Sequence, residues 1–170
     1  MSNSMNVGGG AGAYQDFQAA DNEDVCRQLN SFLRGEISAA ETYRMAIEKA
    51  ADSNSKRAPD VGLLREIQAE HGRAAQALRD RIRELGGEAS DSSGAWGTWA
   101  KFTTGVANLF GDTSTLKALK EGEEHGLKDY EEGLDELDMT SAELVDNQLI
   151  PAQQRHVGIL DQLIRTVGTA

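Results

Sequence analysis

Proline and aromatic residues are scarce in this sequence. It has two prolines, and aromatic side chains make up only 5% of its residues. Ala, Leu, Glu, Lys, Gln and Arg, which favour helix over strand, fill long uninterrupted stretches. We therefore expect an all-α protein. A chain of 170 residues is long enough for one well-packed domain and too short for two comfortable ones.

Other absences limit the compartment and the partners. The single cysteine, Cys26, cannot form an internal disulfide, and nothing else indicates an oxidising compartment. No apolar run approaches the length of about 18 residues that a membrane span needs, and the N-terminus has neither the basic start nor the hydrophobic stretch of an export signal. The net charge of -11 repels nucleic acid phosphates and anionic membranes. We expect a cytoplasmic protein that binds neither nucleic acid nor membrane.

Four amphipathic segments follow a start that is rich in Gly, Ala, Ser and Asn. Residues 1–20 show no helical period and are expected to form a flexible tail. Apolar residues then recur at threes and fours, which predicts helices over 22–51, 59–85, 114–137 and 141–168. Pro59 suits the first turn of the second helix, and Thr140 with Glu143 forms a capping box at the start of the fourth. Pro151 predicts a kink or a delayed start there.

A longer connection separates the second and third helices. It places Trp96, Trp99, Phe102, Val106 and Phe110 at helical spacing, which predicts a short crossover helix over 94–109. Its aromatic side chains pack onto the bundle in the interpretation that we favour; the alternative is a contact between copies in a homo-oligomer. Two short connections and one long one predict a four-helix bundle over 21–170, made of two helical hairpins joined by the crossover.

A short pattern occurs twice. Gly35-Glu36 is followed by Tyr43, and Gly122-Glu123 by Tyr130, each tyrosine seven residues after the glutamate. The first glutamate precedes His71 by 35 residues, and the second precedes His156 by 33. The repetition indicates a duplicated helix pair that carries polar groups inward.

Polar residues interrupt the apolar stripe near the middle of every long helix. They are Glu36 in the first, Gln68 and His71 in the second, Glu123 in the third, and Gln153 and His156 in the fourth. Residues three apart share a helix face, so each Gln and His pair points toward one place in the bundle centre. Carboxylate and imidazole donors suit iron, manganese or zinc. His125 lies one position off the stripe and is expected at the surface or boundary.

These segments resemble a known family. Gly35-Glu36 through Tyr43 and Gly122-Glu123 through Tyr130 are similar to the Gly-Glu helices of rubrerythrin and other ferritin-like proteins, and Gln68-Ala69-Glu70-His71 stands where that family has Glu-x-x-His. With the Trp-bearing crossover, residues 22–168 resemble a family of small uncharacterised bacterial ferritin-like domains.

The resemblance implies a four-helix bundle whose family site holds two iron or manganese ions for oxidation, peroxide reduction or iron handling. By position, Glu36 and His71 would serve one ion, and Glu123 and His156 the other. Tyr43 would be a hydrogen-bond donor behind these ligands, as would Tyr130.

One departure from the family pattern changes the expected chemistry. Gln68 and Gln153 stand where the family has the glutamates that bridge the two metals. Glu36 and Glu123 supply two negative charges. Two divalent ions would therefore keep about two units of uncompensated positive charge. One ion of iron, manganese or zinc, or none, fits this charge count.

Two functions remain open. The first is a ferritin-like, stress-associated interaction protein with a remnant or partial metal site; in its metal-free form Glu36 pairs with His71, and Glu123 with His156. The alternative is a functional metal-dependent oxidoreductase or iron-handling protein. The sequence does not decide whether the protein is an enzyme. It identifies no catalytic residue, organic cofactor or partner protein.

Overall fold

The computed structural model describes residues 10–52, 60–94 and 112–169. Every regular element in these ranges is a helix, which confirms the expected all-α class for this part of the chain. None of the helices described here combines the length and the apolar content that crossing a bilayer would need. The predicted helix over 94–109 falls almost wholly on residues 95–111, outside the described ranges, together with its Trp and Phe residues.

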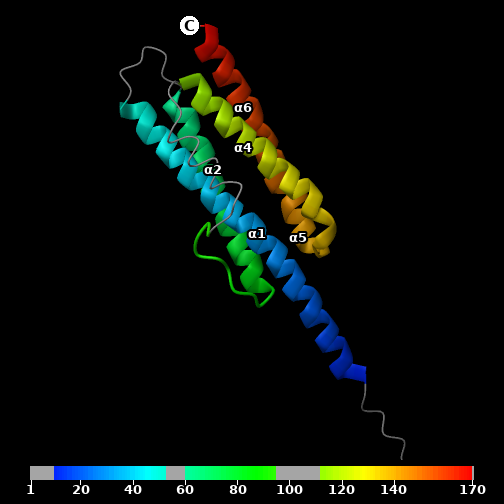
Figure 1. The fold of residues 1–170 in the computed structure, drawn as a ribbon. Coiled ribbons are helices and arrows are strands. Elements are labelled where there is room, and N and C mark those ends of the chain that lie inside the picture. The colour runs from blue at the N-terminus through cyan, green and yellow to red at the C-terminus, as the bar shows by residue number, and fades with distance from the viewer. Residues whose placement is uncertain (1–9, 53–59, 95–111, 170) are drawn as a thin grey trace, which may run out of the picture.

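The long helices are arranged as two antiparallel pairs (Figure 1). Helix α1 (Gly10–Asp52) lies along α2 (Val61–Glu84), and α4 (Asp112–Gly133) lies along α6 (Ile150–Thr169). The two pairs meet chiefly where α1 contacts α4, whereas α2 and α6 have little direct contact. Helices α2 and α4 run in the same direction. The two pairs lie side by side in one four-helix arrangement.

Helix α1 begins earlier than the sequence predicted. It starts at Gly10, not near residue 22, so the flexible tail expected over 1–20 is corrected for residues 10–20; residues 1–9 are outside the described ranges. The added turns are rich in Ala and Gln, which have high helix propensity. Extending a helix that already exists avoids the cost of nucleation. Figure 1 shows this end of α1 projecting beyond the other helices.

Side-chain and glycine caps set the ends of α2. The Asp60 Oδ1 accepts the Gly62 N–H at 2.8 Å, a cap that contributes about 1 kcal/mol. At the other end Gly86 has a φ of 79°, its N–H donates to the Arg83 carbonyl, and the Gly87 N–H donates to the Ile82 carbonyl. This is a Schellman motif, and it needs the left-handed backbone that glycine adopts without strain.

The second hairpin turns earlier than predicted. Helix α4 ends at Gly133, and the 3-10 turn η1 (Leu134–Glu136) follows, whereas we expected helix to residue 137. Asp138, not Thr140, caps α5 (Met139–Leu144): its carboxylate accepts the N–H groups of Thr140 and Ser141. Arg81 of α2 also donates to Asp138, at 2.8 Å. A carboxylate can accept all three hydrogen bonds, which explains why Asp138 displaces Thr140 as the cap.

The irregularity predicted at Pro151 takes the form of a π-helical segment, η2 (Val145–Leu149). The Ile150 N–H donates to the Val145 carbonyl, five residues earlier. Proline has no N–H and its ring crowds the preceding turn of an α-helix, so the wider π turn accommodates it. Helix α6 then continues from Ile150 to Thr169.

Two apolar clusters form the core, and a polar layer lies between them. The first cluster includes Leu29, Leu33, Leu78, Ile82, Tyr130 and Val145. The second includes Tyr43, Leu64, Ile67, Leu116, Leu119 and Leu160. Fully burying a leucine contributes about 1.5–3 kcal/mol, so the clusters hold the helices together on both sides of the polar layer.

Candidate metal centre

The polar layer contains one glutamate or histidine from each long helix. Glu36 of α1, His71 of α2, Glu123 of α4 and His156 of α6 are all at most 5% exposed. Charged groups at such depth are costly unless they pair with one another. Their mutual contacts therefore determine what this layer can do.

His71 joins the two glutamates. Its Nδ1 lies 2.8 Å from the Glu36 Oε2, and its Nε2 lies 3.0 Å from the Glu123 Oε1. Burial by itself would lower the pKa of His71, but the Glu123 and Glu36 carboxylates outweigh it and raise the pKa to about 10. An imidazole donates from both nitrogens only when it is protonated, which matches this arrangement.

Glu123 is the centre of the layer. Its Oε1 contacts His71, as described above, and its Oε2 lies 3.3 Å from the His156 Nδ1. Burial would raise the pKa of this carboxyl group, yet the two histidines together lower it to about 2. Glu123 is therefore ionised although it is completely buried.

The tyrosines connect the two copies of the repeat. The Tyr43 hydroxyl donates to the Glu123 Oε1 at 2.5 Å, and the Tyr130 hydroxyl donates to the Glu36 Oε1. Each tyrosine thus serves the glutamate of the other copy. Burial, followed by the adjacent carboxylate, raises the pKa of both hydroxyls well above the ordinary value, so they remain neutral donors.

The two glutamines of the Gln-x-x-His segments have different positions. The Gln153 Nε2 donates to the Glu123 Oε2 at 2.5 Å and to the Glu123 carbonyl at 3.1 Å. The Gln68 Nε2 instead donates to the carbonyl of Ala40 at 3.3 Å. Of the residues predicted for the site, the structure brings together Glu36, His71, Glu123, Gln153 and His156, and it leaves Gln68 outside.

Gly126 leaves room for the Gln153 amide in the layer. A Cβ at Gly126 would lie 2.8 Å from the Gln153 Nε2, so the missing side chain makes room for the amide. The corresponding position in the first copy, also three residues after the glutamate, is Ala39, which carries a Cβ. A single methyl group thus distinguishes the two copies at this point.

Glu70 is a member of the site that sequence reasoning missed. The Glu70 Oε2 lies 2.9 Å from the His156 Nε2 and 3.0 Å from the Arg155 Nη2. Burial opposes ionisation of Glu70, but His156 and Arg155 lower its pKa below the ordinary value. Aligning the two Gln-x-x-His segments could have indicated that Glu70 and Arg155 pair, because they occupy equivalent positions and carry opposite charges.

Three of these side chains are arranged as ligands for one ion. His71, Glu123 and His156 each offer a ligand atom, and these atoms lie within 4.8 Å of one another. The remaining nitrogen of each histidine faces a further carboxylate, Glu36 or Glu70, as is usual for metal-binding histidines. Among the described residues, no buried side-chain nitrogen or oxygen lacks a hydrogen-bond partner.

A small cavity adjoins the layer between α1 and α4. Its volume is about 20 Å³, and its lining includes Glu36, His71, Gly126, Tyr130 and Gln153. A site of this size holds about one water molecule. It is too small for an organic substrate.

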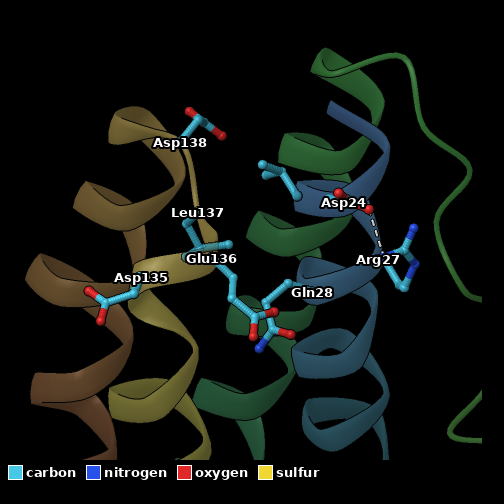
Figure 2. A pocket seen from close by; sticks show the side chains of 8 residues that line it. Asp24, Arg27, Gln28, Asp135, Glu136, Leu137 and Asp138 are labelled. Atoms are coloured by element: carbon cyan, nitrogen blue, oxygen red, sulfur yellow. Dashed lines mark ion pairs between the residues drawn. The ribbon is translucent and has the colours of Figure 1, made fainter. Parts of the chain in front are cut away.

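A larger hollow lies elsewhere, between residues 24–28 of α1 and the turn at η1 (Figure 2). Its volume is about 560 Å³, and Asp24, Asp135, Glu136 and Asp138 make its lining acidic. Arg27, which also lines it, pairs with Asp24 at 2.7 Å through side chains that are more than half exposed. We assign this hollow no role in the buried site.

Comparison with known sequences places residues 24–136 in one family, described as a domain of unknown function, DUF2383. The chain belongs to this family. The DUF2383 segment includes Glu36, Glu70, His71 and Glu123, whereas His156 follows its end. No curated protein and no solved structure matches the chain.

Proposed function

We propose that this DUF2383 protein is a ferritin-like four-helix bundle that binds one transition-metal ion through His71, Glu123 and His156. The observation that carries the proposal is the orientation of the histidines. Each turns one nitrogen toward Glu123, and a second carboxylate holds the other nitrogen. Metal-binding histidines are oriented in this way, because the carboxylate fixes the ring and increases its basicity.

The charges of the layer also fit one divalent ion. Both nitrogens of each histidine face carboxylate oxygens, and one nitrogen of each faces Glu123. Glu36 and Glu123 supply two negative charges, which match one divalent ion, while the third carboxylate, Glu70, also pairs with Arg155. Since an uncompensated charge would be costly at this depth, this balance favours one ion.

A two-ion site fits the residues poorly. Gln153 turns its amide nitrogen, which donates, toward Glu123, and Gln68 lies against the Ala40 carbonyl. Neither amide can bridge two metals as a carboxylate does. The site is therefore proposed as a partial remnant of the two-ion centre that the ferritin-like resemblance implies.

The donor set suits iron, manganese or zinc, because two imidazoles and one carboxylate are common ligands for all three. A bound iron or manganese ion would supply redox chemistry, and zinc would supply a Lewis acid. Glu36 and Glu70 would hold the two histidines in place. Gln153 and Tyr43 would hold the Glu123 carboxylate.

A metal-free structural role is the second candidate. It is favoured by the direct contacts of His71 with both glutamates, at 2.8 and 3.0 Å, and by the complete pairing of buried polar side chains in the described residues. On this proposal the bundle serves as a stress-associated interaction protein, and the polar layer fixes the pairing of the two hairpins.

Metal titration of the full chain separates the two candidates. We expect purified protein soaked with zinc, ferrous iron or manganese to bind about one ion per chain, and the variant His156→Gln to lose it. His125→Gln is the matched control, because His125 contacts only Asp129 at the surface of α4 in the contacts described. Less than about 0.1 ion per chain with every metal would favour the metal-free role.

A further inference from the structure

Glu70 links two helices that otherwise have little direct contact. It lies on α2, and two of its three partners, Arg155 and His156, lie on α6, while the third, Arg73, lies on α2 and is 3.7 Å from the other carboxylate oxygen. Its side chain is 29% exposed, whereas the His156 side chain is 3% exposed. Glu70 therefore reaches from the edge of the bundle to a histidine in its centre, and it does not touch Glu123.

The repeat shows what Glu70 changes. In both copies the histidine Nδ1 faces the glutamate of its own copy: His71 faces Glu36, and His156 faces Glu123. The His71 Nε2 then faces the glutamate of the other copy, Glu123. Symmetry would turn the His156 Nε2 toward Glu36, but it faces Glu70 instead.

This break in the symmetry decides where the ligands gather. Because Glu70 holds the His156 Nε2, only His71 contacts Glu36, and Glu123 is the one glutamate of the pair that both histidines contact. The rings of His71 and His156 meet edge to face, with centroids 4.9 Å apart. Arg155 donates to the same Glu70 oxygen, so it steadies the carboxylate from the other side.

We propose that Glu70 is a positioning residue that fixes the ring of His156 and thereby makes the site asymmetric, with one group of ligands around Glu123. The inference deepens the proposed function, since a ring fixed in this way presents its Nδ1 to the ion. The orientation of the ring can nevertheless be measured in protein without metal.

The test compares Glu70→Ala, Glu70→Gln and the control Glu66→Ala in the full chain. Glu66 is exposed and lies one turn before Glu70 on α2. Nitrogen-15 NMR of metal-free protein reports the His156 Nε2–H group, and titration with Co²⁺ reports the affinity for a divalent ion. Far-UV circular dichroism verifies that each variant remains helical.

We expect Glu70→Ala to lose the slowly exchanging His156 Nε2–H signal and to bind Co²⁺ about 10–100-fold more weakly. Glu70→Gln keeps an acceptor oxygen, so it should retain the signal and recover part of the affinity. Glu66→Ala should match the unaltered protein in both measurements.

The two measurements can fail separately. An unchanged His156 signal in Glu70→Ala would overturn the positioning role, whether or not metal binds. An altered His156 signal with unchanged Co²⁺ affinity would overturn the claim that the orientation of the His156 ring determines metal binding around Glu123. If the unaltered protein bound no Co²⁺, zinc, iron or manganese, the proposed function would be lost, and the NMR comparison alone would decide the role of Glu70.

Discussion

Tyr43 and Glu123 are 80 residues apart and belong to different copies of the repeat, yet the tyrosine hydroxyl donates to the glutamate at 2.5 Å. Tyr130 and Glu36 repeat this relationship in the opposite sense. Each tyrosine extends from one apolar cluster into the polar layer, Tyr43 from the second and Tyr130 from the first. The crossed pairs therefore join the two hairpins at their common centre.

Removing the two hydroxyls should have unequal effects. Without Tyr130, the Glu36 carboxylate retains His71, while loss of Tyr43 leaves Glu123 with His71, His156 and Gln153. We expect Tyr130→Phe to lower the free energy of unfolding by about 1.5–3 kcal/mol, and Tyr43→Phe by less. Urea denaturation of metal-free protein measures both. A larger loss for Tyr43→Phe would contradict this account of the network.

Stability should depend on pH on both sides of a plateau. The pKa of His71 rises from 6.5 to about 10 on folding, so its contribution is complete below about pH 6.5 and is lost as the pH rises toward 10. The pKa of Glu123 falls from 4.5 to about 2, so its contribution is complete above about pH 4.5 and is lost as the pH falls toward 2.

Metal-free protein should therefore be most stable near pH 5–6, with a loss on the order of a few kcal/mol between pH 7 and 10. Urea denaturation across this range checks the prediction. His71→Gln, which has no titrating ring, should lose most of the alkaline dependence, and His125→Gln should keep it. A flat profile for the unaltered protein would count against a protonated His71.

Gly126 and Gly158 provide a matched pair of glycine substitutions. Gly126→Ala would place a Cβ 2.8 Å from the Gln153 Nε2, so the amide must move away from Glu123, and we expect the lost hydrogen bonds, worth about 1–3 kcal/mol, to outweigh a helix gain of about 0.5–1 kcal/mol. Gly158 is exposed within α6, and nothing lies within 4 Å of a Cβ there. Gly158→Ala should therefore gain about 0.5–1 kcal/mol. Thermal and urea denaturation report both, and equal effects would remove the steric role assigned to Gly126.

Introducing a glutamate at position 153 should couple stability to metal. The Gln153 amide donates to Glu123 at 2.5 Å, so a glutamate at position 153 would set two carboxylates against each other. We expect Gln153→Glu to destabilise metal-free protein, and manganese or ferrous iron to restore its stability. Gln154→Glu, on the exposed side of the same helix, is the control.

The double variant Gln68→Glu with Gln153→Glu should bind a second ion. Ion content after soaking and dialysis measures this gain, with Gln153→Glu alone for comparison. If the double variant gained no metal, the derivation of this site from a two-ion centre would be contradicted.

The sequence predicted the helices because each long helix carries its own apolar period, which local spacing reveals. It also placed Glu36, His71, Glu123 and His156 on inward faces, since interruptions of an apolar stripe are visible in one dimension. The helix limits were predicted less well. Asp138 replaced Thr140 as a cap because Arg81, which is distant in sequence, helps to hold the aspartate.

The sequence predicted the pairs Glu36–His71 and Glu123–His156, and the tertiary structure decided which other polar groups join them. The repeat made Gln68 and Gln153 equivalent, but Gln153 enters the layer beside Gly126, whereas Gln68 donates to the Ala40 carbonyl. The repeat also gave the two histidines the same role, but Glu70 on α2 holds the His156 Nε2, which symmetry would direct to Glu36. Sequence periodicity thus determined which side chains face the core, because a helix is built by local contacts. The choice of partners depended on contacts between helices far apart in the chain, which spacing along one helix does not encode.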